Sequence, residues 1–118
     1  MNVVAQFDPS VLTSDIFVVP SSAANGKIVI YNESNISLTL SFQDGGTAYV
    51  PAWMAMLYPT PPGTVNITWV QHTILNSSNP PLSMVIVETY AQGEFVPGTF
   101  PLTLSRQSNV GNSVGTIV

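Results

Sequence analysis

The sequence predicts an all-β protein, built as a single antiparallel β-sandwich or partly open barrel with extended arms at both ends. The clearest sign is residues 36–42, Ile-Ser-Leu-Thr-Leu-Ser-Phe, in which large apolar side chains alternate with small polar ones. Successive side chains of a strand point to opposite faces, so this stretch is expected to have one buried and one wet face. Six to eight such strands, separated by turn residues and with no convincing helix, are typical of a sandwich or barrel.

The first half of the predicted domain follows from turn residues. Residues 27–32 form the first clear strand, and the turn-forming residues 32–35 lead into the strand over 36–43, so we expect these two strands to make an antiparallel hairpin. Asp44-Gly45-Gly46 can reverse the chain after that strand, and residues 47–50 continue as the next one.

The second half contributes four more strands. The apolar run 52–58 is expected to be a strand because it is short and a proline block follows it. Residues 64–75 form the longest strand, and its alternation slips near 71–73, which predicts a bulge. Residues 82–90 are apolar on both faces and are placed centrally. Residues 99–104 contain Pro101 and are placed at an edge.

The two ends are expected to be arms. Residues 1–22 have apolar side chains without a sustained period, interrupted by Pro9 and Pro20, and we expect an extended N-terminal arm with one short strand over 16–19. Residues 105–118 contain glycines that disfavour a helix, which predicts an extended C-terminal arm. The sandwich domain proper then covers residues 23–104.

Charge is scarce in this chain and limits its partners. Charged residues make up 7% of the chain and the formal net charge is −4, whereas roughly 25% is ordinary for a soluble domain. Ser, Thr, Asn and Gln together make up 38 of the 118 residues. Lys27 and Arg106 are the only cations, so nucleic-acid binding is not expected. No signal peptide and no membrane-spanning segment are predicted.

Catalysis and metal binding are not expected either. The chain has no cysteine and one histidine, His72, and although Ser77 and Ser78 are close in sequence, no Gly-x-Ser-x-Gly elbow accompanies them. The six carboxylates are scattered singly, without the pairing of a glycosidase or the clustering of a calcium loop. We therefore expect no enzyme, no cofactor and no metal.

Glu88 stands out among the carboxylates because it lies near the end of an apolar strand. A buried carboxylate there would need a cation, which Arg106 or Lys27 could supply. Four Asn-X-Ser/Thr triplets, at Asn32, Asn35, Asn66 and Asn76, are expected by chance in so polar a sequence and are given no function.

Aromatic side chains leave carbohydrate binding open as an alternative. Trp69 is in step with apolar neighbours of its strand, so the core is expected to take it, whereas the positions of Trp53 and Tyr58 stay open. The aromatic side chains that could stack against a sugar in such a site are Trp53, Trp69, Tyr49, Tyr58 and Tyr90.

Self-assembly explains the apolar arms better, because extended segments that order on a partner can cover a large surface. The residues expected to make contacts between chains are Phe7, Ile16, Phe17, Arg106, Val110, Val114 and Ile117.

The C-terminal third carries a resemblance to a known class of proteins. Residues 85–90, Gly93-Glu94 and especially 101–112, with the stretch Arg-Gln-Ser-Asn-Val-Gly-Asn, resemble small virion proteins of tailed bacteriophages, namely the β-sandwich cement or decoration proteins of the capsid. The resemblance implies a homotrimer that binds and stabilises the major capsid protein, made in the cytoplasm of the bacterial host and located on the capsid surface. It brings no site residues with it. A phage tail, baseplate or fibre subunit, or a carbohydrate-binding module, is the alternative.

Overall fold

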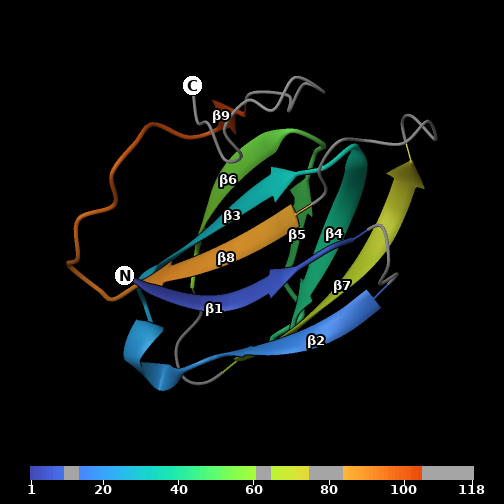
Figure 1. The fold of residues 1–118 in the computed structure, drawn as a ribbon. Coiled ribbons are helices and arrows are strands. Elements are labelled where there is room, and N and C mark those ends of the chain that lie inside the picture. Colours follow the sequence, from blue (N-terminus) through green and yellow to red (C-terminus); the bar gives the residue numbers. More distant parts are fainter. Residues whose placement is uncertain (10–13, 61–64, 75–83, 105–118) are drawn as a thin grey trace.

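The computed structural model describes residues 1–9, 14–60, 65–74 and 84–104, with the backbone alone at 14, 15, 17 and 65–74 (Figure 1). These residues form nine β-strands and one short 3-10 turn, η1, and no helix among them is long and apolar enough to cross a bilayer. The elements are β1 (Asn2–Phe7), β2 (Ser14–Val19), η1 (Ser21–Ala23), β3 (Lys27–Glu33), β4 (Ile36–Phe42), β5 (Thr47–Val50), β6 (Met54–Pro59), β7 (Val65–Ile74), β8 (Met84–Tyr90) and β9 (Leu102–Thr103).

The strands are those of one long hairpin rolled into two sheets. β4 pairs with β5, β3 with β6, β2 with β7 and β1 with β8, all antiparallel, as if the hairpin were folded at the β4–β5 turn. Two further pairs, β3 with β8 and β4 with β7, roll this hairpin up. The result is a five-stranded sheet in the order β1-β8-β3-β6-β9 and a four-stranded sheet in the order β2-β7-β4-β5. This connectivity is a jelly roll, with β9 added at one edge.

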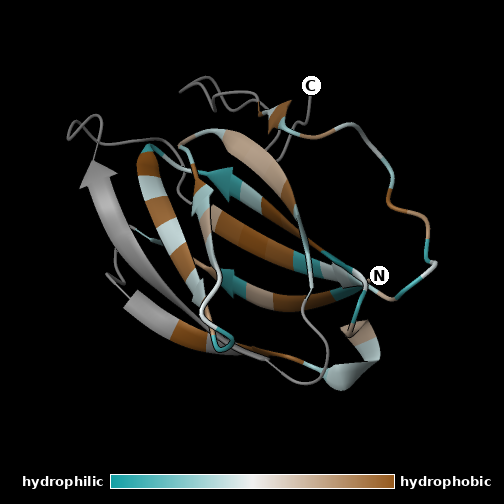
Figure 2. Ribbon diagram, turned by 180° about the vertical axis from the view of Figure 1, so that it is seen from behind, coloured by the Kyte–Doolittle hydropathy of each residue, from teal (hydrophilic) through white to brown (hydrophobic). Residues whose placement is uncertain are grey.

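The core lies between the two sheets and is built from strand alternation. Leu38 and Leu40 of β4 are buried while Ser41 is exposed, and Figure 2 shows the alternating bands along this strand. The buried core residues are Ile28, Ile30, Val85 and Val87 from the five-stranded sheet, Ile36, Leu38, Leu40, Ala48 and Val50 from the four-stranded sheet, and Val19 and Ala23 nearby. The predicted all-β sandwich is confirmed, and the two sheets are not closed into a barrel.

Several predicted elements are confirmed in place. The Asp44-Gly45-Gly46 turn joins β4 to β5: Gly45 has a φ of 98°, and the Gly46 N–H donates to the Asp44 carboxylate at 3.0 Å. The expected strand over 52–58 is observed as β6, which begins at Met54 and ends at Pro59, and β9 pairs with β6 at the edge of its sheet. β8 is central, between β1 and β3.

The predicted bulge is confirmed in the pairing of β7 with β4. Ser37 is opposite Thr73 and Leu38 is opposite Gln71, so His72 is the extra residue. A bulge of this kind bends a strand and increases its twist. The break in alternation that the sequence carries at 71–73 therefore has a structural cause.

The expected N-terminal arm over 1–22 is wrong, because residues 2–7 and 14–19 are strands of the sandwich itself. The short strand expected over 16–19 is part of β2. The pattern of β1 is obscured by a register shift between Val3 and Ala5, which brings both Val4 and Ala5 against the core. Both strands have one neighbour each among the described strands, β8 for β1 and β7 for β2, so their periodicity is weak. The C-terminal arm over 105–118 lies outside the described residues.

The expected hairpin between 27–32 and 36–43 is also wrong. Both strands exist, but β3 lies in one sheet and β4 in the other. Residues 32–35 therefore form a corner that carries the chain across the sandwich, and all four are buried, with side chains 0% to 5% exposed. A hairpin loop at the surface would leave such residues in water.

Asn32 and Ser34 hold this corner by satisfying buried backbone groups. The Asn32 side-chain amide donates to the carbonyl oxygens of Ile36 at 2.8 Å and Pro51 at 3.1 Å. The Ser34 hydroxyl donates to Asn32 Oδ1 at 2.6 Å and accepts from the Ile36 N–H at 3.2 Å, and the Trp53 N–H donates to the Ser34 carbonyl at 3.1 Å. Polar side chains at Asn32 and Ser34 are thus needed to make buried hydrogen bonds, and not to form a surface turn.

We expect Asn32→Ala to lower the free energy of unfolding by about 2–4 kcal/mol, because it leaves buried carbonyl groups without their donor. Equilibrium unfolding in urea measures the change. Asn2→Ala, at an exposed asparagine of β1, is the matched control and is expected to stay within about 0.5 kcal/mol of the wild type. Equal stabilities of the two variants would contradict the role of the Asn32 corner.

Candidate functional site

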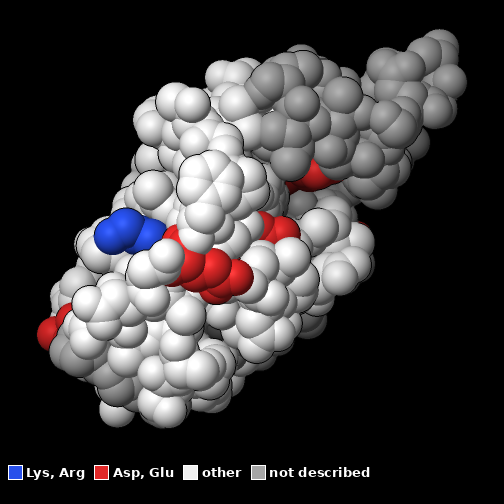
Figure 3. Space-filling view, turned by 90° about the vertical axis from the view of Figure 1, so that its left-hand side faces the viewer, with Lys and Arg blue, Asp and Glu red and all other residues white. Residues whose placement is uncertain are grey.

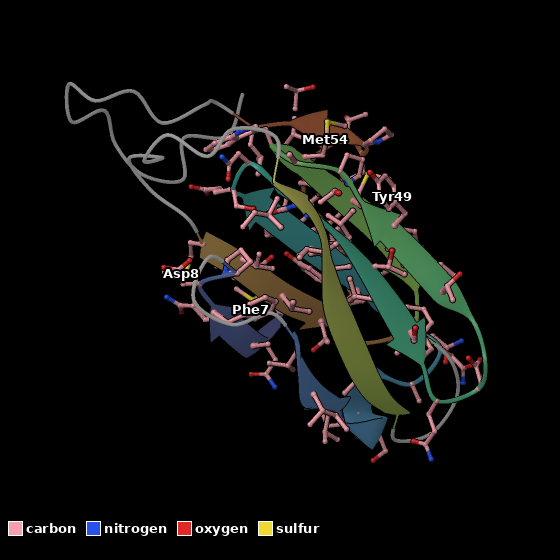
Figure 4. All side chains as sticks on the ribbon, turned by 90° about the vertical axis from the view of Figure 1, so that its right-hand side faces the viewer. Phe7, Asp8, Tyr49 and Met54 are labelled. Carbon is pink, nitrogen blue, oxygen red and sulfur yellow. The ribbon has the colours of Figure 1, made fainter. Side chains whose placement is uncertain are left out.

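Three of the seven residues predicted at an interface lie in the described part of the chain, and they differ in placement. Phe7, at the end of β1, is half-buried and packs against the core of its own chain, so its assignment to an arm is wrong (Figure 4). Ile16 of β2 is 56% exposed. The backbone of Phe17 pairs with Ile67 of β7. The other four, Arg106, Val110, Val114 and Ile117, lie outside the described residues.

Exposed aliphatic side chains gather on the first two strands. Met1, Val3, Ile16 and Val18 are 57%, 48%, 56% and 50% exposed, and they are carried by β1, β2 and the residue before β1. These strands lie side by side at one margin of the sandwich, each the last strand of its sheet (Figure 1). We call these four residues the edge surface.

The opposite margin of the sandwich is covered by the chain itself. β9 pairs with β6 through Met54 and Ala55 and so covers the edge of β6. Tyr58 of β6 donates from its hydroxyl to the backbone carbonyl of Tyr49, which lies on the neighbouring strand β5. Tyr49 and Met54 mark this margin in Figure 4. The two margins of the described sandwich therefore differ, because β1 and β2 are the outermost described strands of their sheets whereas β6 has β9 beside it.

Phe95 is the most exposed large apolar residue described, at 81%. It follows β8 in a loop whose base is fixed: the Glu94 carboxylate bonds the N-terminal ammonium of Met1 and accepts from the Ala91 N–H at 2.9 Å, and the Glu94 N–H donates to the Ala91 carbonyl. The ammonium and the Ala91 N–H hold the pKa of Glu94 below its usual value. A large aromatic side chain is thus presented to solvent from an anchored turn.

Few charged side chains lie on the described surface, and they are mostly acidic. Lys27 is the one Lys or Arg of the described ranges and appears in blue in Figure 3, next to a few acidic side chains, while most of that face is uncharged. Interface cores are typically depleted of charged residues. The edge surface and Phe95 therefore resemble contact regions in composition.

Glu88 is paired differently from the expectation. Tyr90 donates from its hydroxyl to Glu88 Oε1 at 3.0 Å, and Tyr31 joins the same hydrogen-bonded group on the outer face of the five-stranded sheet. Burial, then Glu88, raises the pKa of Tyr90 to about 12, and the same two causes raise the pKa of Tyr31. Two tyrosine hydroxyls, from Tyr90 and Tyr31, take the place of the expected cation at Glu88. Of the two expected cations, Lys27 lies on the neighbouring strand β3 and Arg106 lies outside the described residues.

The side chains of the candidate residues for chemistry lie outside the described part of the structure. His72 is the bulge residue of β7, where only the backbone is described, and Ser77 and Ser78 lie outside the described residues. Within the described ranges no three His, Cys, Asp or Glu side chains are placed to share a metal ion. The described geometry therefore offers no assembled reactive centre.

The candidate sugar-binding aromatics also differ in exposure. Tyr58 packs against the core and Tyr90 is 4% exposed. Trp53 is half-buried at the corner, and the side chain of Trp69 is not described. Tyr49, at 53%, is the one of the five that is more than half exposed among those described. The four described side chains therefore do not form one exposed platform.

Two of the four Asn-X-Ser/Thr triplets are closed to modification in the folded chain, since Asn32 and Asn35 are 0% and 3% exposed. Sequence reasoning did not single out Val3, Val18 and Phe95, whose side chains are exposed. A signal for the first two was present, because no Lys, Arg or Pro interrupts residues 2–7 or 14–19. Phe95 directly precedes a Val-Pro-Gly turn, which was a signal for exposure.

Comparisons with family models, with curated proteins and with solved structures find no match to this chain.

We expect Glu88→Gln to lower the pKa values of Tyr31 and Tyr90 partway toward 10, because the carboxylate is lost while burial, the larger cause, remains. Titration of the tyrosine ring signals by NMR measures the change. In the wild type, these raised values stabilise the fold fully below about pH 10, and that contribution is lost as the pH rises through about 12. The variant is expected to lose less stability across this window, and unchanged titrations would contradict the Tyr31–Glu88–Tyr90 group.

Proposed function

We propose that this chain is a non-enzymatic structural protein of a tailed-phage virion, a capsid cement or decoration protein that trimerises and binds the major capsid protein. The observation that carries the proposal is the placement of the exposed large apolar residues: five of the six lie at the edge surface or at Phe95, on a surface with little charge. Large apolar side chains that stay exposed at one margin of a fold are typical of protein interfaces.

The fold and the resemblance support the same class. Jelly rolls occur in viral capsid and lectin domains, which is a fold-level analogy and no more. The resemblance over residues 85–112 points to virion proteins. β1 and β2 belong to the sandwich and do not form an arm. Their exposed side chains are therefore the ones proposed to make the contacts between chains that were expected of an arm.

Phe95 is the residue proposed to bind the major capsid protein. Its side chain is 81% exposed, and the anchored base of its loop lowers the entropy lost when the ring is fixed in a partner's pocket. Large aromatic anchors of this type often contribute most of the binding free energy at an interface.

Two measurements test the proposal. Light scattering over a range of concentrations is expected to give three times the chain mass of 12.6 kDa. Labelled antibody against the chain is expected to decorate the heads of the phage that encodes it. Label confined to tails or fibres would favour the alternative virion roles, and a monomer absent from purified virions would overturn the proposal.

Phe95→Ser is expected to weaken binding to those heads by about tenfold or more while the thermal unfolding midpoint stays the same, because the ring contacts the partner and not the core. Sedimentation of the protein with empty heads measures the binding. Gln92→Ala, at an exposed residue of the same loop, is the control and should bind like the wild type. Equal binding by both variants would remove Phe95 from the contact.

A further inference from the structure

The edge surface has the chemistry of a strand-pairing site. β1 and β2 are the outermost described strands of their sheets on one margin, and Val3, Ile16 and Val18 on them are about half exposed. An edge strand presents backbone N–H and C=O groups that another strand can pair with. The occupant that fits such a margin is an extended strand with apolar side chains.

These two strands carry few of the devices that normally prevent such pairing. Natural edge strands are typically blunted by lysine, proline, inward charges or a covering segment. Residues 2–7 contain no charged residue and no proline, and residues 14–19 contain Asp15 as their one charge. β1 does have a bulge, between Val3 and Ala5, whereas the register of β2 with β7 is regular.

A second copy of this chain can supply the matching strand. The described sheets have four edges: β1, β9, β2 and β5. β9 has two residues and β5 has four, and the Tyr49 carbonyl of β5 already accepts from Tyr58. β1 and β2 have six residues each. β1 of a neighbouring copy is therefore the edge that matches β2 in length and brings no charge against Asp15.

We propose that β2 of one copy pairs antiparallel with β1 of the next, so that three copies close a ring. This inference rests on the proposed function, because it is the trimer that requires a head-to-tail contact between two different edges. β1 and β2 run in opposite directions within one copy (Figure 1), and rotation about an axis along the strands keeps that sense. With the two strands centred on each other, Val3 lies opposite Val18, so two exposed side chains cover each other.

The absence of cysteine from the chain makes this contact testable by cross-linking. Val3→Cys and Val18→Cys proteins are prepared separately, mixed, exchanged between oligomers and oxidised. We expect disulfide-linked chains on a non-reducing gel from the mixture and at least tenfold less from either protein alone. Mixing two single variants excludes a disulfide within one chain.

The outcomes separate this inference from the proposed function. Efficient cross-linking of Val18→Cys alone would overturn the head-to-tail pairing and indicate a two-fold contact. A mixture that stays uncross-linked while light scattering still reports a trimer would overturn the inference and leave the proposed function standing. A wild-type monomer at all concentrations would overturn both.

A second pair of variants tests the same surface without a disulfide. We expect Val18→Lys to raise the dissociation constant of the oligomer at least tenfold, because a charge would be buried at the contact. Tyr49→Lys, at a similarly exposed residue on the opposite margin, is the control and should leave it unchanged. Circular dichroism checks that both fold.

In the wild type, amide hydrogen exchange over residues 14–19 is expected to slow at high protein concentration, because β2 is then paired, while exchange over residues 47–50 stays the same. The reverse result would overturn the pairing.

Discussion

The buried corner at residues 32–35 decides which strands of this protein can pair. Backbone carbonyl groups in the interior need donors, and the amide of Asn32 supplies them to Ile36 and Pro51. Because the corner sends β3 and β4 to different sheets, the two strands do not pair, and both edges of each strand remain available to other strands. β3 can then lie between β6 and β8, and β4 between β5 and β7. The rolled hairpin is not compatible with a direct β3–β4 pairing.

That arrangement also determines what remains at the surface. The inner strands are covered on both edges, and the end of the hairpin leaves β1 and β2 at one margin. The other margin is covered by β9 and by the Tyr58 hydroxyl. The exposed aliphatic side chains of Val3, Ile16 and Val18 are thus a consequence of topology as well as of composition, and they occur where a further strand can be added.

The sequence predicted those parts of the fold in which one strand carries its own signal. Residues 36–42 alternate strictly, and residues 82–90 are apolar on both faces, so β4 and the central β8 could be found from side-chain pattern alone. The slip at His72 likewise predicted a bulge. The N-terminal strands were missed because the β1 bulge puts Val4 and Ala5 on the core together, which removes the period that defines a strand.

Features that depend on contacts across the fold could not be predicted in the same way. The polar residues at 32–35 have the composition of a surface turn, and their burial follows from carbonyl groups at Ile36 and Pro51 that a local pattern does not include. The hydrogen-bonded group around Glu88 has the same character, because Tyr31 comes from another strand. In both cases a polar residue has at least one partner that is distant in sequence, Pro51 for Asn32 and Tyr31 for Glu88.

The pairing of β1 with β8 has a consequence for how the chain is made. Among the described strands β1 comes first in chain order and β8 eighth, so the β1–β8 pair cannot form until residues 84–90 have been translated. Val4, Ala5 and Phe7 pack against a core that includes Val85 and Val87 of β8, so that core is incomplete before then. A product truncated before residue 84 therefore lacks the strand that joins β1 to the rest of the five-stranded sheet.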